Sequence, residues 1–145
     1  MSKVFTLGEA QTLLPVLEAL LKRARTAALR GVELELEMQR LCHRIFLSGG
    51  MHVDVAAAAR RSAERDKAGQ ETKDTIAEIE AIGVRVHDLQ GGVLDFPCMV
   101  ERRAVLLCWA LGEETISHWH EESDEVEKRR PLDGRFDKVE RERLN

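Results

Sequence analysis

The stretch that decides the fold is Val93–His120, VLDFPCMVERRAVLLCWALGEETISHWH. It contains both tryptophans, two of the three cysteines and the only closely spaced pair of histidines. Residues 93–96 fit a short strand, and the apolar run 104–109 suits a central strand buried on both faces. The polar residues 101–103 between them fit a hairpin tip. The stretch therefore predicts two antiparallel strands joined by a tight turn.

Extended segments flank this pair on both sides. After Gly83 the apolar period changes from about 3.6 residues to 2, which is typical of a strand, and residues 90–92 form a turn signal. On the other side, residues 115–120 alternate Ile116, His118 and His120 with Ser117 and Trp119. The sequence thus predicts a small antiparallel meander of three or four strands over about 84–120.

Two long helices are predicted before this sheet. Thr6 and Glu9 fit a capping box, and apolar residues then recur at helical spacing to residue 45. Pro15 lies too deep for a first-turn proline, so we expect a kink or a break near it. The Ser-Gly-Gly at 48–50 ends the first helix, and Gly83 is placed to end the second. The predicted helices span about 7–47 and 54–82.

These elements predict an α+β protein, in which a long antiparallel helical hairpin is followed by a small antiparallel β-meander. The apolar face of the second helix is thin, with almost nothing to bury over residues 65–70. Since a lone pair of such helices cannot cover its own apolar stripe, we predict a homodimer through the helical hairpin. Residues 1–120 are expected to form a single domain. Residues 121–145, with nine acidic and seven basic side chains, are expected to be a charged, mobile tail.

Composition excludes several classes of partner. The net charge is −4 and the pI about 5.8, so there is no basic field for a nucleic acid. The longest apolar run, residues 104–111, is far shorter than the roughly 20 residues of a membrane span. No signal-peptide pattern opens the chain, and three cysteines without framework spacing indicate reduced thiols. We therefore expect a cytoplasmic protein.

One group of residues carries candidate chemistry. His118 and His120 are two apart on a predicted strand, so both imidazoles point to one face, about 7 Å apart along the backbone. Asp95 and Glu113 are close enough in the predicted meander to supply carboxylate oxygens. Two histidines and a carboxylate suit zinc or iron and leave coordination positions open. The sequence predicts a metal site of His118, His120, Asp95 and Glu113, and whether it performs chemistry stays open.

Other interpretations of the same residues stay open. The two histidines could be structural, paired with carboxylates at one end of the sheet. Asp95, which precedes an aromatic residue and a proline, could fix a turn instead. Cys108 lies inside an apolar run, where a thiol is unreactive, so we interpret it as a core residue. In the alternative that these readings favour, the protein is a non-catalytic, dimeric interaction or assembly module.

Three motifs carry a family resemblance. Residues 5–15 (FTLGEAQTLLP), 92–97 (GVLDFP) and 105–120 (VLLCWALGEETISHWH) resemble the opening, middle and C-terminal motifs of an uncharacterised bacterial family, the domain of unknown function 2203. The resemblance covers most of residues 4–132 and implies no particular activity. His87 stands where the family more usually has a basic residue, and it is not part of the predicted ligand set. After His120 the chain departs from the family pattern until residues 129–132.

Overall fold

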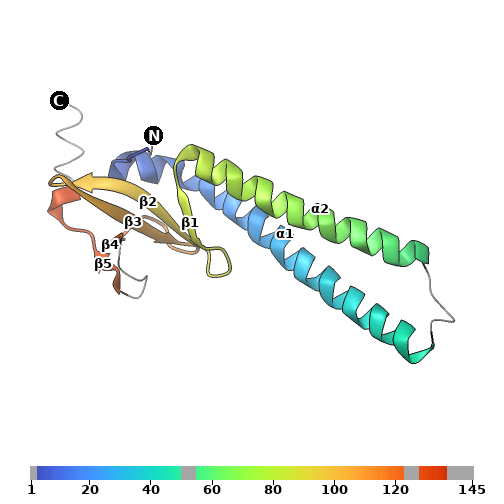
Figure 1. The fold of residues 1–145 in the computed structure, drawn as a ribbon. Helices are drawn as coiled ribbons and strands as arrows, with labels where there is room; N and C mark the ends of the chain where they lie inside the picture. Colours follow the sequence, from blue (N-terminus) through green and yellow to red (C-terminus); the bar gives the residue numbers. More distant parts are fainter. Residues whose placement is uncertain (1–2, 50–54, 123–127, 137–145) are drawn as a thin grey trace. The chain divides into compact units, whose positions relative to one another are not determined.

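The computed structural model describes residues 3–49, 55–122 and 128–136, and it confirms the predicted α+β organisation (Figure 1). Two packed helices, which form a hairpin, are followed by a sheet in which each strand pairs antiparallel with the next. The elements are α1 (Leu7–Leu47), α2 (Val55–Ile82), β1 (Arg85–Asp88), β2 (Val93–Val100), β3 (Arg103–Ala110), β4 (His118–Glu121) and β5 (Arg130–Pro131). None of the described helices is long and apolar enough to cross a membrane.

The chain divides into two compact units, each described by itself. The sheet unit comprises residues 1–22 and 76–145, and the hairpin unit comprises residues 23–75. The first therefore holds the five strands with the adjoining ends of both helices, and the second holds the remainder of the helical pair.

One face of the sheet forms the core of the sheet unit. Alternate residues of β2, among them Leu94 and Phe96, pack in one cluster with Leu17 and Leu21 of α1. The chain start is fixed to this core, because the Phe5 N–H donates to the Pro97 carbonyl at 2.8 Å. The strand period of two leaves the intervening side chains of β2 on the opposite face.

The start of α1 follows the predicted chemistry. The Thr6 N–H donates to Glu9 Oε1 at 3.0 Å and the Glu9 N–H donates to Thr6 Oγ1 at 3.2 Å, which confirms the capping box. Pro15, however, lies inside a helix that continues from Leu7 to Leu47, so the expected break does not occur. One missing backbone donor is outweighed by the burial of Leu14 and Leu17 on either side of the proline.

The end of α2 is set by Gly83. The Gly83 N–H donates to the Glu80 carbonyl at 2.9 Å and the Val84 N–H to the Ile79 carbonyl at 3.4 Å, which is the Schellman pattern. Gly83 has a φ of 109°, and an added Cβ would lie 2.9 Å from the Lys3 Cβ. Backbone conformation and space both require glycine here.

We expect Gly83→Ala to lower the free energy of unfolding by about 1–3 kcal/mol, because it adds backbone strain and a clash. Gly69 is the matched control, since it lies in α2 and an added Cβ would meet nothing within 4 Å. Gly69→Ala is expected to stabilise the protein by about 0.5–1 kcal/mol. Urea unfolding of both variants measures the difference, and equal effects would contradict this account of Gly83.

The seam of the hairpin unit is narrow. Small side chains fill it: Ala24, Ala27 and Ala68 are buried, and Gly31 faces Ala68. Ion pairs join the two helices beside the seam, such as Arg61–Glu37 at 3.1 Å and Arg65–Glu35 at 2.9 Å, together with Arg23–Glu71 and Arg30–Glu64. Exposed pairs of this kind contribute only about 0.2–1 kcal/mol each, so burial of small residues carries the contact.

The sheet extends beyond the predicted boundary at residue 120. Strand β5 pairs with β4, matching Trp119 with Arg130. Phe136 is only 1% exposed and its ring lies 5.8 Å from that of Trp119, so this part of the segment joins the core. The rest of the predicted tail, residues 123–127 and 137–145, lies outside the described residues.

Candidate metal centre

On the face of the sheet opposite the helix-packed core, one row of residues crosses the strands and contains a buried carboxyl group. Strand pairing matches Arg85 with Asp95, Asp95 with Cys108, and Cys108 with His118, so these four residues lie on one line across the strands. Asp95 is only 3% exposed although it is ionisable. A carboxylate buried in this way needs polar partners, because desolvation is otherwise costly.

His87 reaches Asp95 because of an irregularity in β1. The pairing of β1 with β2 shifts between Val86 and Asp88, which leaves His87 as the extra residue of a β-bulge. A bulge redirects a side chain, and the His87 Nδ1 lies 2.8 Å from Asp95 Oδ2. The imidazole is 34% exposed, whereas the Asp95 side chain is 4% exposed. The solvent-facing side of this group is therefore the His87 side.

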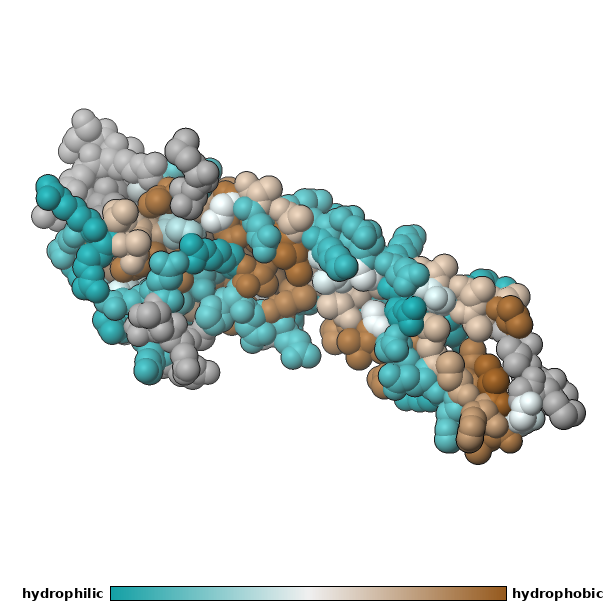
Figure 2. Space-filling view, in the orientation of Figure 1, coloured by the Kyte–Doolittle hydropathy of each residue, from teal (hydrophilic) through white to brown (hydrophobic). Residues whose placement is uncertain are grey.

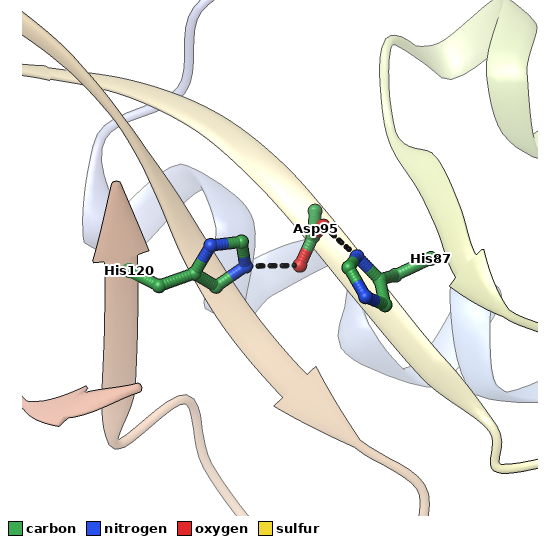
Figure 3. Close-up of side chains that lie close together, drawn as sticks. All are labelled: His87, Asp95 and His120. Atoms are coloured by element: carbon green, nitrogen blue, oxygen red, sulfur yellow. Dashed lines mark hydrogen bonds and ion pairs between the residues drawn. The ribbon is translucent and has the colours of Figure 1, made fainter. Parts of the chain in front are cut away.

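His120 approaches Asp95 from β4, so the carboxylate lies between two imidazoles (Figure 3). The His120 Nε2 lies 3.0 Å from Asp95 Oδ1, and its side chain is only 1% exposed. The rings of His87 and His120 have their centroids 5.8 Å apart at 75°. We call these three residues, His87, Asp95 and His120, the triad.

The second nitrogen of His120 fixes the protonation of the ring. Its Nδ1 lies 2.8 Å from the Glu121 carbonyl oxygen, which can only accept, so Nδ1 carries a proton. In a neutral imidazole Nε2 then presents a lone pair to Asp95 Oδ1. Two lone pairs cannot face each other at this distance without a positive centre between them. A second ring proton, a proton on the carboxyl group or a metal cation can supply it.

The donor set of the triad fits a transition-metal ion. One ligand atom from each side chain can be chosen so that all three lie within 4.8 Å of one another. Zinc and iron bind imidazole nitrogen and carboxylate oxygen at about 2.0–2.2 Å, so ligand atoms around one ion are roughly 3.4 Å apart. The three atoms are therefore close enough together for His87, Asp95 and His120 to be candidate ligands of one ion.

Two of the four predicted ligands lie apart from the triad. The His118 Nδ1 is 2.9 Å from Ser117 Oγ and 3.8 Å from Glu113 Oε2. Both Glu113 oxygens accept from Arg129, at 3.0 and 3.3 Å. The structure thus brings together Asp95 and His120 from the predicted set. His118 contacts Ser117 instead, and the Glu113 carboxylate binds Arg129.

Glu113 is held as an anion that orders a turn. Burial opposes its ionisation, but hydrogen bonds from Arg129 and from the Ala110 N–H outweigh it and lower the pKa of Glu113. Its backbone carbonyl accepts from Trp109 Nε1 at 2.9 Å. These contacts fix the connection between β3 and β4, which is a structural role.

Cys108 is a core residue, as interpreted from the sequence. It is 0% exposed, and burial raises the pKa of its thiol. Arg129 Nη1 lies 4.0 Å from the sulfur, and its opposing influence does not overcome the burial. A buried, protonated thiol is a poor nucleophile, so Cys108 is not a candidate for chemistry on this face.

Comparison with known proteins gives one match. The model of a family described as "Uncharacterized conserved protein (DUF2203)" matches residues 3–132, a range that includes all three triad residues. No curated protein and no solved structure matches the chain.

Proposed function

Because the chain belongs to the DUF2203 family of uncharacterized conserved proteins, its activity has to be argued from its own side chains, and we propose that the triad binds a divalent transition-metal ion, zinc or iron. The proposal keeps Asp95 and His120 from the predicted ligand set. It takes His87 in place of His118, which contacts Ser117, and in place of Glu113, which binds Arg129.

The hydrogen bonding of His120 carries this proposal. A histidine that ligates a metal through one nitrogen usually donates its other N–H to a carbonyl or carboxylate, which fixes the tautomer. His120 has this arrangement: Nδ1 faces the Glu121 carbonyl, and Nε2 faces the carboxylate of Asp95. A cation shared by Nε2 and Oδ1 satisfies both lone pairs without an additional proton.

The exposure of the triad indicates what the ion could do. Asp95 and His120 are almost fully buried, while one third of the His87 side chain is exposed. Two histidines and one carboxylate fill three positions of a coordination sphere of four or more, so the remaining positions would face solvent beside His87. An ion held in this way can bind and polarise water or a small oxygen-containing ligand.

Metal binding is tested by equilibrium dialysis of tag-free protein against zinc or iron(II), followed by elemental analysis. We expect one ion per chain in the parent, and a loss of affinity of at least about 10-fold in His87→Gln and His120→Gln. His118→Gln is the matched control, since His118 neighbours the triad on β4 without joining it. Absence of metal from the parent, or equal losses in all three variants, would overturn the proposal.

A second candidate is the dimeric assembly module, in which the triad only stabilises the sheet. The observation that favours it is a set of exposed apolar side chains on α1, which includes Leu29 and Val32 at 59% and 57% exposure. This candidate predicts self-association without metal. The cytoplasmic location and the absence of a nucleic-acid partner stay predictions from composition.

A further inference from the structure

Helix α1 carries a second apolar stripe in the hairpin unit, on the side away from α2. Leu29 and Leu36 each lie two residues after a buried side chain, Ala27 and Leu34 respectively. Two residues correspond to about 200° of helical rotation, so the exposed and buried side chains lie on opposite sides. We call the exposed set the outer stripe; its members are Leu29, Val32, Leu36, Phe46 and Leu47.

The outer stripe has the spacing of a helix–helix seam. Positions 29, 32, 36, 39, 43 and 46 follow alternating steps of three and four residues, which is the a/d pattern of a heptad. Four of the six are large and apolar, and the polar Gln39 and His43 occupy the other two. Polar residues at such positions typically fix the register of a pair of helices at some cost in stability.

This stripe is unusually exposed for an apolar surface. Its five side chains are between 45% and 81% exposed, and Figure 2 shows hydrophobic surface on this part of the hairpin unit. Single exposed leucines are ordinary, but several large apolar side chains that recur at seam spacing on one side of a helix indicate an interaction surface. A partner helix with matching spacing would cover it.

The charges beside the stripe indicate that the partner is the same helix of a second copy. Glu33 and Arg40 lie on the same flank, each four residues after an a position of the heptad. In an antiparallel pair these positions face each other. Glu33 of each copy therefore lies opposite Arg40 of the other copy. The same register places Leu29 opposite the second Phe46. Parallel pairing would instead use Glu35, which binds Arg65 of α2 at 2.9 Å. Glu33 has a longer ion pair, at 3.4 Å, with Arg30 of its own helix.

We infer that two copies of this chain associate through antiparallel packing of their outer stripes. The interface is two-fold symmetric, because the same surface is used on both copies. It goes beyond the metal proposal and is independent of it, since the triad lies in the other unit.

Sedimentation equilibrium tests the interface. We expect a dimeric parent, and monomers for Leu29→Glu and Leu36→Glu, which place a charge in the seam without disturbing a buried side chain. Ala63→Glu, on the exposed surface of α2, is the matched control and should remain dimeric. Circular dichroism confirms that each variant folds. A monomeric parent, or dimeric Leu36→Glu, overturns the inference.

A charge swap tests the antiparallel direction. Glu33→Arg and Arg40→Glu should each weaken the dimer by several-fold in dissociation constant, because like charges then face each other across the interface. The double variant restores opposite charges and should regain the affinity of the parent. If the double variant does not regain the dissociation constant of the parent, antiparallel pairing is contradicted. The metal content of the protein should be the same in all these variants.

Discussion

Asp95→Ala is expected to lower the free energy of unfolding of the metal-free protein by about 3–5 kcal/mol, the range typical of removing one partner of a buried ionic pair. The Asp95 carboxyl group lies 2.8 Å from His87 Nδ1 and 3.0 Å from His120 Nε2 and is almost fully buried. Without it, His120 Nε2 lies in the protein interior with its partner removed. Urea unfolding in the presence of a chelator measures the loss.

Glu122→Ala is the control for this prediction. Glu122 pairs with Arg85 at 2.9 Å, but both side chains are more than half exposed. Its removal should change the free energy of unfolding by at most about 1 kcal/mol. Added metal extends the comparison: at a free concentration of 100 times the dissociation constant, it should stabilise the parent by about 2.7 kcal/mol and leave Asp95→Ala unchanged. If Asp95→Ala were as stable as Glu122→Ala, the assigned role of Asp95 would be contradicted.

Phe96→Ala is expected to cost about 3–5 kcal/mol, since it creates a cavity in the core of the sheet unit. Phe96 is 0% exposed, and its ring contacts that of Phe5 edge to face with centroids 5.8 Å apart. The truncation therefore also loosens the chain start, which is hydrogen bonded to Pro97.

Met99→Ala is the control from the same strand. Met99 lies on the opposite face of β2 and is 43% exposed, so its truncation should cost less than about 1 kcal/mol. Thermal or urea unfolding of both variants gives the comparison. Equal losses would contradict the assignment of the two faces of β2.

The fold could be predicted because local signals agree with one another. The Thr6–Glu9 box marks the start of α1 and Gly83 the end of α2, and the helical period marks the residues within the helices. The structure confirms all three. The change of period after Gly83 and the polar tip between the two apolar runs mark strands in the same way, although the turn comprises only residues 101–102 and Arg103 already belongs to β3. A helix continued through Pro15 despite its local signal, because packing on both sides outweighed one missing bond.

The sequence predicts only two of the three residues of the triad. Asp95 and His120 were predicted because they lie in recognisable strand motifs, whereas His87 depends on a bulge, which shifts pairing by one residue without a local signature. Glu113 is predicted as a ligand because it precedes the strand of His118 and His120 across a tight turn. Nothing in the sequence shows that Arg129, sixteen residues later, reaches it. Both differences arise from contacts between separate strands and loops.

The central claim is that one ion is shared by three specific side-chain atoms, and nitrogen NMR of histidine-labelled protein tests it most directly. Adding zinc should shift Nε2 of His120 and Nδ1 of His87 to metal-bound values, while Nδ1 of His120 keeps its proton toward the Glu121 carbonyl. The resonances of His118 should not move. Unchanged His87 and His120 resonances at saturating zinc, or a metal-bound shift at His118, would contradict the account.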